Sequence, residues 1–132
     1  MGGYTIGTTL ERPYEKAVRD VRDALEAQGF GVLTEIDLRA TLKKKLDVDV
    51  APQVILGACR PQLAHEALGI DPSIGAVLPC NVTVRSLDAT TTRVEAFDPA
   101  AMTYLAGEAL AGVADEARTR LTAALAALTP ED

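Results

Sequence analysis

The side chains with the greatest chemical reactivity lie close together in this sequence. Both cysteines, Cys59 and Cys80, and the only histidine, His65, fall within residues 54–84. Thiolates and imidazoles act as nucleophiles, and they bind zinc and other soft metals. The spacing therefore raises two hypotheses: a reactive thiol or metal site, or two core thiols beside a surface histidine.

Cys80 fits the second hypothesis. If residues 75–87 form a strand, alternation places Cys80 on an apolar face together with Ala76, Leu78, Val82 and Val84. A small thiol packs well in such a face, and burial raises its pKa and makes it unreactive. We therefore predict that Cys80 is a core residue and not a nucleophile.

Cys59 is harder to assign. It ends a predicted strand just before a helix that begins at Pro61, where the helix dipole favours a thiolate. Arg60 would favour the thiolate too if its side chain turned inward. Gly57 lies on the same strand face and leaves room for a ligand or a neighbouring backbone. The preferred interpretation is that residues 57–59 are small because a helix packs closely on them, and a reactive Cys59 stays open as the alternative.

His65 is predicted to lie on the solvent side of the helix that begins at Pro61. Its spacing from Cys59 matches no compact zinc motif, so the candidate metal ligands are Cys59 and Cys80, and no cofactor is predicted. The candidate binding residues surround the two thiols: Gly57, Cys59, Arg60, Pro79, Cys80 and Asn81.

Other motifs that carry chemistry are missing from the sequence. It contains no phosphate loop, dinucleotide-binding glycine motif, zinc-protease motif or serine-hydrolase elbow. Glu35 and Asp37 could form a pair of catalytic acids. However, Asp37 directly precedes the helical stretch LRATLKKKL, which favours an N-cap. We predict no catalytic residue, and the sequence favours a protein that is not an enzyme.

Composition narrows the class of protein further. A chain of 132 residues with 48% hydrophobic and 24% charged residues predicts one globular domain, residues 1–132. The net charge of −6 disfavours nucleic acid as a partner, and the run Lys43-Lys44-Lys45 is interpreted as the solvated end of a helix. No apolar run is long enough to span a membrane, and the N-terminus lacks a signal-peptide core. We expect a cytosolic protein whose cysteines are free thiols.

Periodicity predicts the elements that position these residues. Strands are expected over residues 4–10, 30–37, 50–59, 75–87 and 91–97, with Phe30, Val32 and Ile36 on one face of the second strand and Glu35 and Asp37 on the other. Helices are expected from Pro13 to Gly29, over residues 38–46 and 61–70, and over residues 108–128. The last helix carries a long apolar stripe: Leu110, Val113, Ala117, Leu121, Ala124, Leu125 and Leu128.

This order predicts an α+β fold that begins with a β-α-β unit, has a mainly antiparallel sheet with helices packed on one face, and ends in a long helix. The other face of the sheet must be covered by a ligand, by a partner or by its own polar side chains.

Four segments of the chain resemble the domain-of-unknown-function 302 family of small bacterial and archaeal proteins. They are GFGVLTEIDL, VILGACRPQLAHEAL, IGAVLPCNVTV and FDPAAM. The resemblance implies the same β-α-β start and terminal helix, in a layout similar to TATA-binding-protein-like folds. It also implies a homodimer, but no activity. The family often has Asn where this chain has Arg60, which puts in doubt any site that depends on an amide there.

Three functional hypotheses follow. The leading one is a cytosolic homodimer that binds a small ligand or a partner near the Cys59 and Cys80 segments. The first alternative is a cysteine-based redox, sulfur-transfer or soft-metal-binding protein that uses the same two thiols. The second is a purely structural interaction module in which these segments only fix the packing of strands and helices.

Overall fold

A five-stranded antiparallel sheet forms the centre of the computed structural model, which describes residues 3–129. The strands lie in the order β1-β5-β4-β3-β2, and each is antiparallel to its neighbours. Their bounds are β1 Thr5–Leu10, β2 Gly31–Asp37, β3 Gln53–Cys59, β4 Cys80–Asp88 and β5 Thr91–Phe97. β3 is therefore an inner strand, as its nearly continuous apolar sequence predicts.

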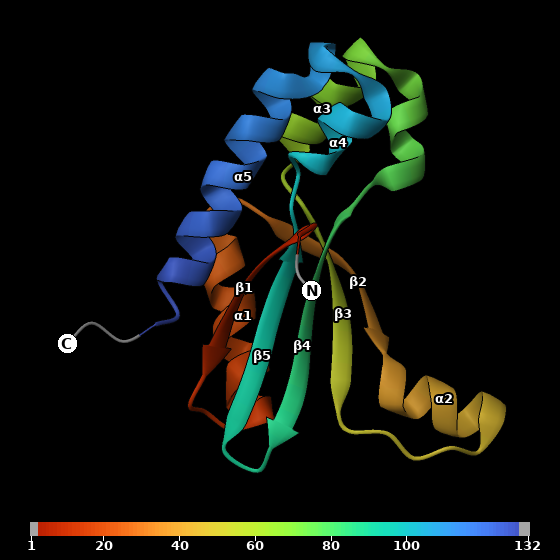
Figure 1. The fold of residues 1–132 in the computed structure, drawn as a ribbon, viewed down its shortest axis with the longest axis vertical. Helices are drawn as coiled ribbons and strands as arrows, with labels where there is room; N and C mark the ends of the chain where they lie inside the picture. Colours follow the sequence, from red (N-terminus) through yellow and green to blue (C-terminus); the bar gives the residue numbers. More distant parts are fainter. Residues whose placement is uncertain (1–2, 130–132) are drawn as a thin grey trace.

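The β-α-β start is confirmed in an unusual arrangement. β1 and β2 lie at opposite edges of the sheet, and the antiparallel steps between them make the two strands parallel. Helix α1 (Tyr14–Ala27) crosses behind the sheet to connect them (Figure 1). The chain turns away from the helix at Gly29, whose positive φ of 83° is a conformation that glycine adopts without strain.

Helices cover one face of the sheet and one of its ends. The helices after α1 are α2 Leu38–Leu46, α3 Pro61–Ile70, η1 Pro72–Val77, α4 Ala101–Ala106, η2 Glu108–Leu110 and α5 Ala111–Ala126. α1 and α5 pack on the covered face, whereas α3, η1, α4 and η2 gather beyond one end of the strands (Figure 1). We call these four elements the cap. Within residues 3–129, no helix is both long and apolar enough to cross a membrane.

The long terminal helix joins two hydrophobic clusters. Val113, Ala114 and Ala117, near its start, belong to a cluster with α3, η1 and α4. Leu121 and Leu125, further along, belong to a second cluster with the sheet and α1. All seven residues of the predicted stripe are buried. The predicted long terminal helix is confirmed over residues 108–126, two residues short of the predicted end.

The faces predicted for the second strand are wrong beyond residue 32. The pairing of β2 with β3 shifts between Val32 and Thr34, and one extra residue in a strand reverses the side on which every later side chain points. Glu35 and Asp37 consequently face α1, and Ile36 lies on the open face with 44% of its surface exposed.

The strand predicted over residues 75–87 begins later than expected. β4 starts at Cys80, and residues 72–77 form the short helix η1. The Asp71 side chain accepts a hydrogen bond from the Ser73 amide at 3.0 Å, which starts this turn at Pro72. Ala76 and Leu78 therefore precede the strand, and only Cys80, Val82 and Val84 share its buried face.

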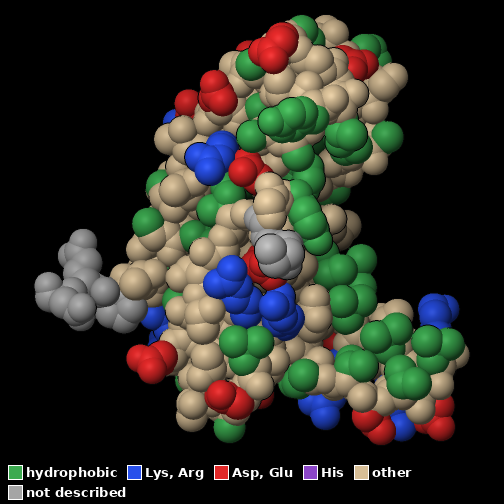
Figure 2. All heavy atoms as spheres, viewed as in Figure 1, with side chains coloured by type: hydrophobic (Ala, Val, Ile, Leu, Met, Phe, Trp, Pro, Cys, Tyr) green, Lys and Arg blue, Asp and Glu red, His purple; other side chains and the backbone are tan. Residues whose placement is uncertain are grey.

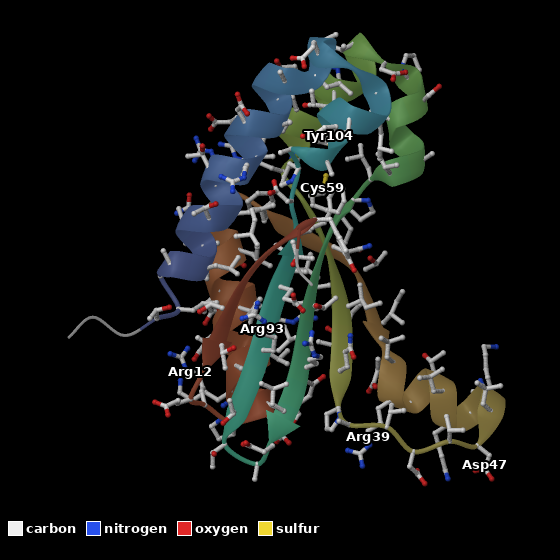
Figure 3. The ribbon with its side chains drawn as sticks, viewed as in Figure 1. Arg12, Arg39, Asp47, Cys59, Arg93 and Tyr104 are labelled. Atoms are coloured by element: carbon white, nitrogen blue, oxygen red, sulfur yellow. The ribbon has the colours of Figure 1, made fainter. Side chains whose placement is uncertain are left out.

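Helix α2 projects from the sheet as an arm. It begins at Asp37, as predicted, because the Asp37 carboxylate accepts a hydrogen bond from the Ala40 amide at 3.0 Å. None of its residues is buried, and Figure 3 shows Asp47 at its far tip. Its basic residues lie in solvent, with Lys43 paired to Asp47 and Asp49.

Candidate functional site

The structure brings the six predicted binding residues to one end of β3 and β4, beside the cap. Ala58 lies opposite Cys80 and Gly57 opposite Asn81 in the register of the two strands. Because side chains alternate, Cys80 points toward the helices and Asn81 toward the open face. The predicted set is therefore divided between two faces of the sheet.

The helix side of this region contains a small apolar cavity. Cys59, Arg60, Pro79 and Cys80 line it together with apolar residues of β3, α3 and α5. Its volume is about 30 Å³, which is space for a few water molecules at most. An organic ligand does not fit in this space.

Cys80 is a core residue, as predicted. It is 8% exposed, and it packs in the cluster formed by the sheet, α1 and α5. Burial, and to a lesser extent the nearby Cys59, raises the pKa of its thiol to about 11. At neutral pH the group is a neutral thiol and a poor nucleophile.

Cys59 is half-buried and, like Cys80, is a free thiol. Figure 3 places it where the sheet meets the cap. His65 is exposed on α3, as predicted. In the described part of the chain, no group of three or more histidine, cysteine, aspartate or glutamate side chains could hold a metal ion. Metal binding by Cys59 and Cys80 stays a prediction, and no third protein ligand accompanies them among the described residues.

The room that Gly57 leaves is already filled. A Cβ atom at this position would overlap Thr34 Oγ1 and lie 2.9 Å from Pro79 Cγ. Both neighbouring side chains thus lie directly over the Gly57 backbone. Close packing, and not space for a ligand beside Cys59, explains this glycine.

Arg60 fastens the end of α1 and does not cap α3. Its Nε donates a hydrogen bond to the Gln28 carbonyl at 3.2 Å, and its side chain lies against Gly29. It makes no side-chain cap at the start of α3, since a guanidinium has only donors and cannot accept from the backbone amides there. The guanidinium satisfies a carbonyl that the end of α1 leaves without a helical partner.

The two acids of β2 have structural partners. Asp37 is the N-cap of α2, and Glu35 forms an ion pair with Arg22 of α1. The N-cap interpretation of Asp37 is therefore confirmed, and neither acid has the other as its hydrogen-bond partner among residues 3–129.

The open face of the sheet holds a larger groove. Its volume is about 480 Å³, and it lies between the face of β1, β5, β4 and β3 and the edge of the cap. Six polar residues form the floor: Thr5, Gln53, Asn81, Thr83, Arg85 and Glu95. Five apolar residues form the rim: Tyr4, Val77, Pro79, Phe97 and Leu105. We call this space the open-face groove.

A polar network organises the floor of the groove. Arg85 Nη1 donates to Glu95 Oε1 at 2.5 Å, and Thr5 Oγ1 donates to Glu95 Oε2 at 3.1 Å. These contacts, with the hydrogen bond from Arg85 as the largest cause, lower the pKa of Glu95 below its ordinary value. The carboxylate is charged at neutral pH and fixes the position of the arginine.

Only part of this groove belongs to the predicted set. Pro79 and Asn81 line it, whereas Gly57, Cys59, Arg60 and Cys80 do not. Alternation along β4 puts Asn81, Thr83 and Arg85 on the face opposite Cys80. The signal for the remaining residues was weak, because the sequence does not reveal that β5 and β1 lie beside β4 or that η1 and α4 form a wall.

Comparisons with known proteins identify the family. A family model described as "Domain of unknown function DUF302" matches residues 6–128. The chain belongs to this family. Among curated proteins, none matches it.

A solved member of the family has the same fold. The crystal structure of an uncharacterized conserved DUF302 protein from Bacillus stearothermophilus matches with a TM-score of 0.87 and 25% sequence identity. The match covers 97% of this chain and 100% of that one. The β-α-β start and terminal helix that the resemblance implied are thus confirmed, and the family description assigns no activity.

Proposed function

We propose that this DUF302 protein binds a small organic molecule in the open-face groove, beside the Cys59 and Cys80 segments. The observation that carries the proposal is the groove itself, with a polar floor, an apolar rim and a volume of about 480 Å³. Ligand sites are typically concave spaces of roughly 300–1,000 Å³ that combine apolar walls with a few polar groups. The cavity that touches both thiols, at about 30 Å³, is too small for such a role.

The predicted residues enter this proposal unequally. Pro79 belongs to the rim and Asn81 to the floor, so both would contact the ligand. The other four predicted residues would not contact the ligand and would only hold the ends of β3 and β4 in place: Gly57, Cys59, Arg60 and Cys80. Since Thr34 and Pro79 fill the space over Gly57, this end of the groove has a fixed wall.

An uncharged fluorescent probe, N-phenyl-1-naphthylamine, tests the proposal. We expect saturable binding that weakens at least about fivefold in Leu105→Asp, because a charge at the apolar rim opposes an aromatic ligand. Leu105 is 70% exposed, so the substitution should leave the fold intact. Leu87→Asp is the matched control, since Leu87 is 50% exposed and does not line the groove. Absence of saturable binding, or equal weakening in both variants, would contradict the proposal.

A homodimer is the second part of the proposal. β2 is an edge strand, and apolar side chains are exposed on β2, at the end of α2 and in the segment that follows α2: Leu33, Ile36, Leu46, Val48 and Val50. Figure 2 shows hydrophobic side chains gathered around the arm. Exposed apolar patches and unpaired strand edges are typical of interfaces.

Light scattering coupled to size-exclusion chromatography tests the dimer. We expect a dimeric mass for the native chain and a monomeric mass for the double variant Leu46→Asp, Val48→Asp. A monomeric native chain at micromolar concentration would refute this part and leave ligand binding untouched.

The two alternatives have less support. Thiol chemistry would rely on Cys80, whose thiol is buried with a pKa of about 11, and on Cys59 without a metal-binding group around it in residues 3–129. Two free thiols do support a reducing, cytosolic location. A structural module is the conclusion if the groove binds no small molecule.

A further inference from the structure

We infer that the ligand of the open-face groove is an organic monoanion, a carboxylate or sulfonate with an apolar body, whose acidic group binds Arg85. This inference rests on the proposed function and specifies the class of ligand.

A cluster with a charge of +1 lies on the open face of a protein that is acidic as a whole. It consists of Arg85, Arg93 and Glu95, which occupy adjacent paired positions on β4 and β5. Asp88, at the hairpin end of β4, is the other charged side chain at the paired positions of this face and balances the cluster, whereas the whole chain has a charge of −6. Figure 2 shows basic side chains together near the centre of the face, and Figure 3 places Arg93 there.

The carboxylate of Glu95 lies near both Arg85 and Arg93. Arg85 and Arg93 lie directly opposite each other on β4 and β5, where like charges repel. Glu95 lies 2.5 Å from Arg85 Nη1 and 3.8 Å from Arg93 Nη2, and its Oε2 also accepts from Thr5. A single carboxylate balances only one of the two guanidinium charges, so a second anion would be favourable here.

The two arginines are held in different places. The Arg93 guanidinium lies over Gly7, where a Cβ atom would be only 2.6 Å from Nη2, and its Nη1 donates to Thr9 Oγ1 at 3.1 Å. Arg93 is thereby held over β1, outside the groove lining (Figure 3). Arg85 lines the groove with 40% of its side chain exposed. Arg85 would contact the ligand, and Arg93 would add to the positive potential.

Neutral donors surround Arg85. Gln53 is its register partner on β3, and Asn81 and Thr83 precede it on the same face of β4. A guanidinium has five N–H donors. Within residues 3–129, Arg85 donates a hydrogen bond to Glu95 through Nη1, so its other nitrogens have donors for a ligand. Side-chain amides beside a guanidinium are well suited to the oxygens of a carboxylate or sulfonate.

The rim determines the rest of the ligand. Tyr4, Val77, Phe97 and Leu105 present apolar surface above the polar floor, and Tyr4 and Leu105 are 63% and 70% exposed. A hydrocarbon or aromatic body would cover these side chains while its acidic group reached Arg85. A small inorganic anion would leave them in water, so the amphipathic anion is the occupant that the groove favours.

Two probes with the same aromatic body test the inference. 1-Anilinonaphthalene-8-sulfonate carries the anionic group, and N-phenyl-1-naphthylamine lacks it. We expect the sulfonate to bind the native chain more tightly and to weaken with added sodium chloride, while the neutral probe does not respond to salt. Arg85→Gln should weaken sulfonate binding about tenfold or more and change neutral-probe binding less than about twofold.

Controls separate the ligand class from the site. Arg39→Gln removes an exposed cation on the arm and should change neither affinity, whereas Arg85→Lys, which keeps the charge, should weaken the sulfonate less than Arg85→Gln does. Circular dichroism and the melting temperature establish that each variant is folded. If both probes bind the native chain alike and Arg85→Gln affects both or neither, the anion inference is overturned and the groove stands. If neither probe binds, the proposed function fails first.

Discussion

Gly57 is a residue for which the sequence predicts close packing but not the neighbours that supply it. The preferred interpretation attributed its small size to a closely packed helix, but the side chains over it are Thr34 and Pro79. The sequence could not reveal this, because Thr34 comes from β2 through a register shift and Pro79 precedes β4 by one residue. Such contacts between distant segments are not encoded in local spacing.

The first prediction concerns this contact. Gly57→Ala should lower the free energy of unfolding by about 1 to 3 kcal/mol, because Pro79 cannot move far from the new methyl group. Urea denaturation measures the change. Thr34→Ala in the same chain should restore part of the loss, since it removes the overlapping Oγ1.

Gly112→Ala is the control for that experiment. A Cβ at Gly112, in α5, meets nothing within 4 Å, so alanine should stabilise the helix by about 0.5 to 1 kcal/mol. Equal effects of alanine at positions 57 and 112 would refute the packing explanation of Gly57.

The second prediction concerns Cys80 at alkaline pH. Burial raises the thiol pKa from 9.0 to about 11, so the folded state favours the neutral form. This contribution to stability is fully present below pH 9 and is lost as the pH rises through about 11. The pKa difference corresponds to about 2.7 kcal/mol.

Unfolding by urea at pH 8 and pH 10.5 tests this contribution. Native protein should lose more stability between the two pH values than Cys80→Val, in which the thiol is absent and every tyrosine and lysine remains. The small cavity beside Cys80 has space for the added methyl group. Identical losses in the two proteins would show that Cys80 does not cause the effect.

At the scale of elements, amphipathic periodicity predicts well and irregularities do not. α1, the hairpin of β4 and β5 and the last helix follow directly from apolar spacing and turn residues. The register shift in β2 depends on how residues 32–34 pair with β3. The turn of η1 depends on the hydrogen bond between the Ser73 amide and Asp71. A single extra residue reverses a strand's faces, and the sequence of the strand itself does not show it.

The third prediction concerns the arm. Because α2 buries no residue, its stability depends on local interactions such as the Asp37 cap at 3.0 Å. Asp37→Ala should destabilise this helix by about 1 kcal/mol, so that the amides of residues 40–46 exchange roughly fivefold faster. Hydrogen exchange with mass spectrometry measures this, and the rest of the sheet should be unchanged.

Asp23→Ala is the matched control for the cap, since Asp23 is an exposed acid on α1. It should leave exchange in the arm unaffected. Unchanged exchange in Asp37→Ala as well would mean that the cap does not hold α2.

At the scale of the whole molecule, α5 connects the cap to the sheet. Its two ends contribute to two separate hydrophobic clusters. Arg12 adds a connection at the far end, since its Nη1 pairs with Asp20 at 2.9 Å and its Nη2 donates to the Leu128 carbonyl at 2.6 Å. Because both clusters contain residues of the same helix, unfolding of one cluster would disrupt α5 and thereby destabilise the other.

The fourth prediction follows from this coupling. Leu110→Ala in the cap cluster and Leu121→Ala in the sheet cluster should each lower stability by about 2 to 5 kcal/mol. Both residues are fully buried. Circular dichroism and tyrosine fluorescence should report the same single transition in each variant. Two separate transitions in Leu110→Ala would show that the cap unfolds independently.

The location of the candidate site is also a property of the whole molecule. The sequence led to Pro79 and Asn81 through the segments around the cysteines, and the structure places both in the groove. Arg85, Glu95 and Leu105 come together only because β5 lies beside β4 and α4 follows β5 at the same end. Their chemistry was visible in the sequence, and their convergence was not.

The sheet order also bears on synthesis of the chain. β2, β3, β4 and β5 are neighbours in the same order in which a ribosome would produce them. β1 is made first, yet its pairing partner is β5, with Thr5 opposite Phe97. The earliest strand therefore waits for most of the chain before it can pair, and it forms contacts of long sequence separation, which fold slowly. A nascent chain that stops before residue 91 would leave both β1 and one edge of β4 exposed to association with other chains.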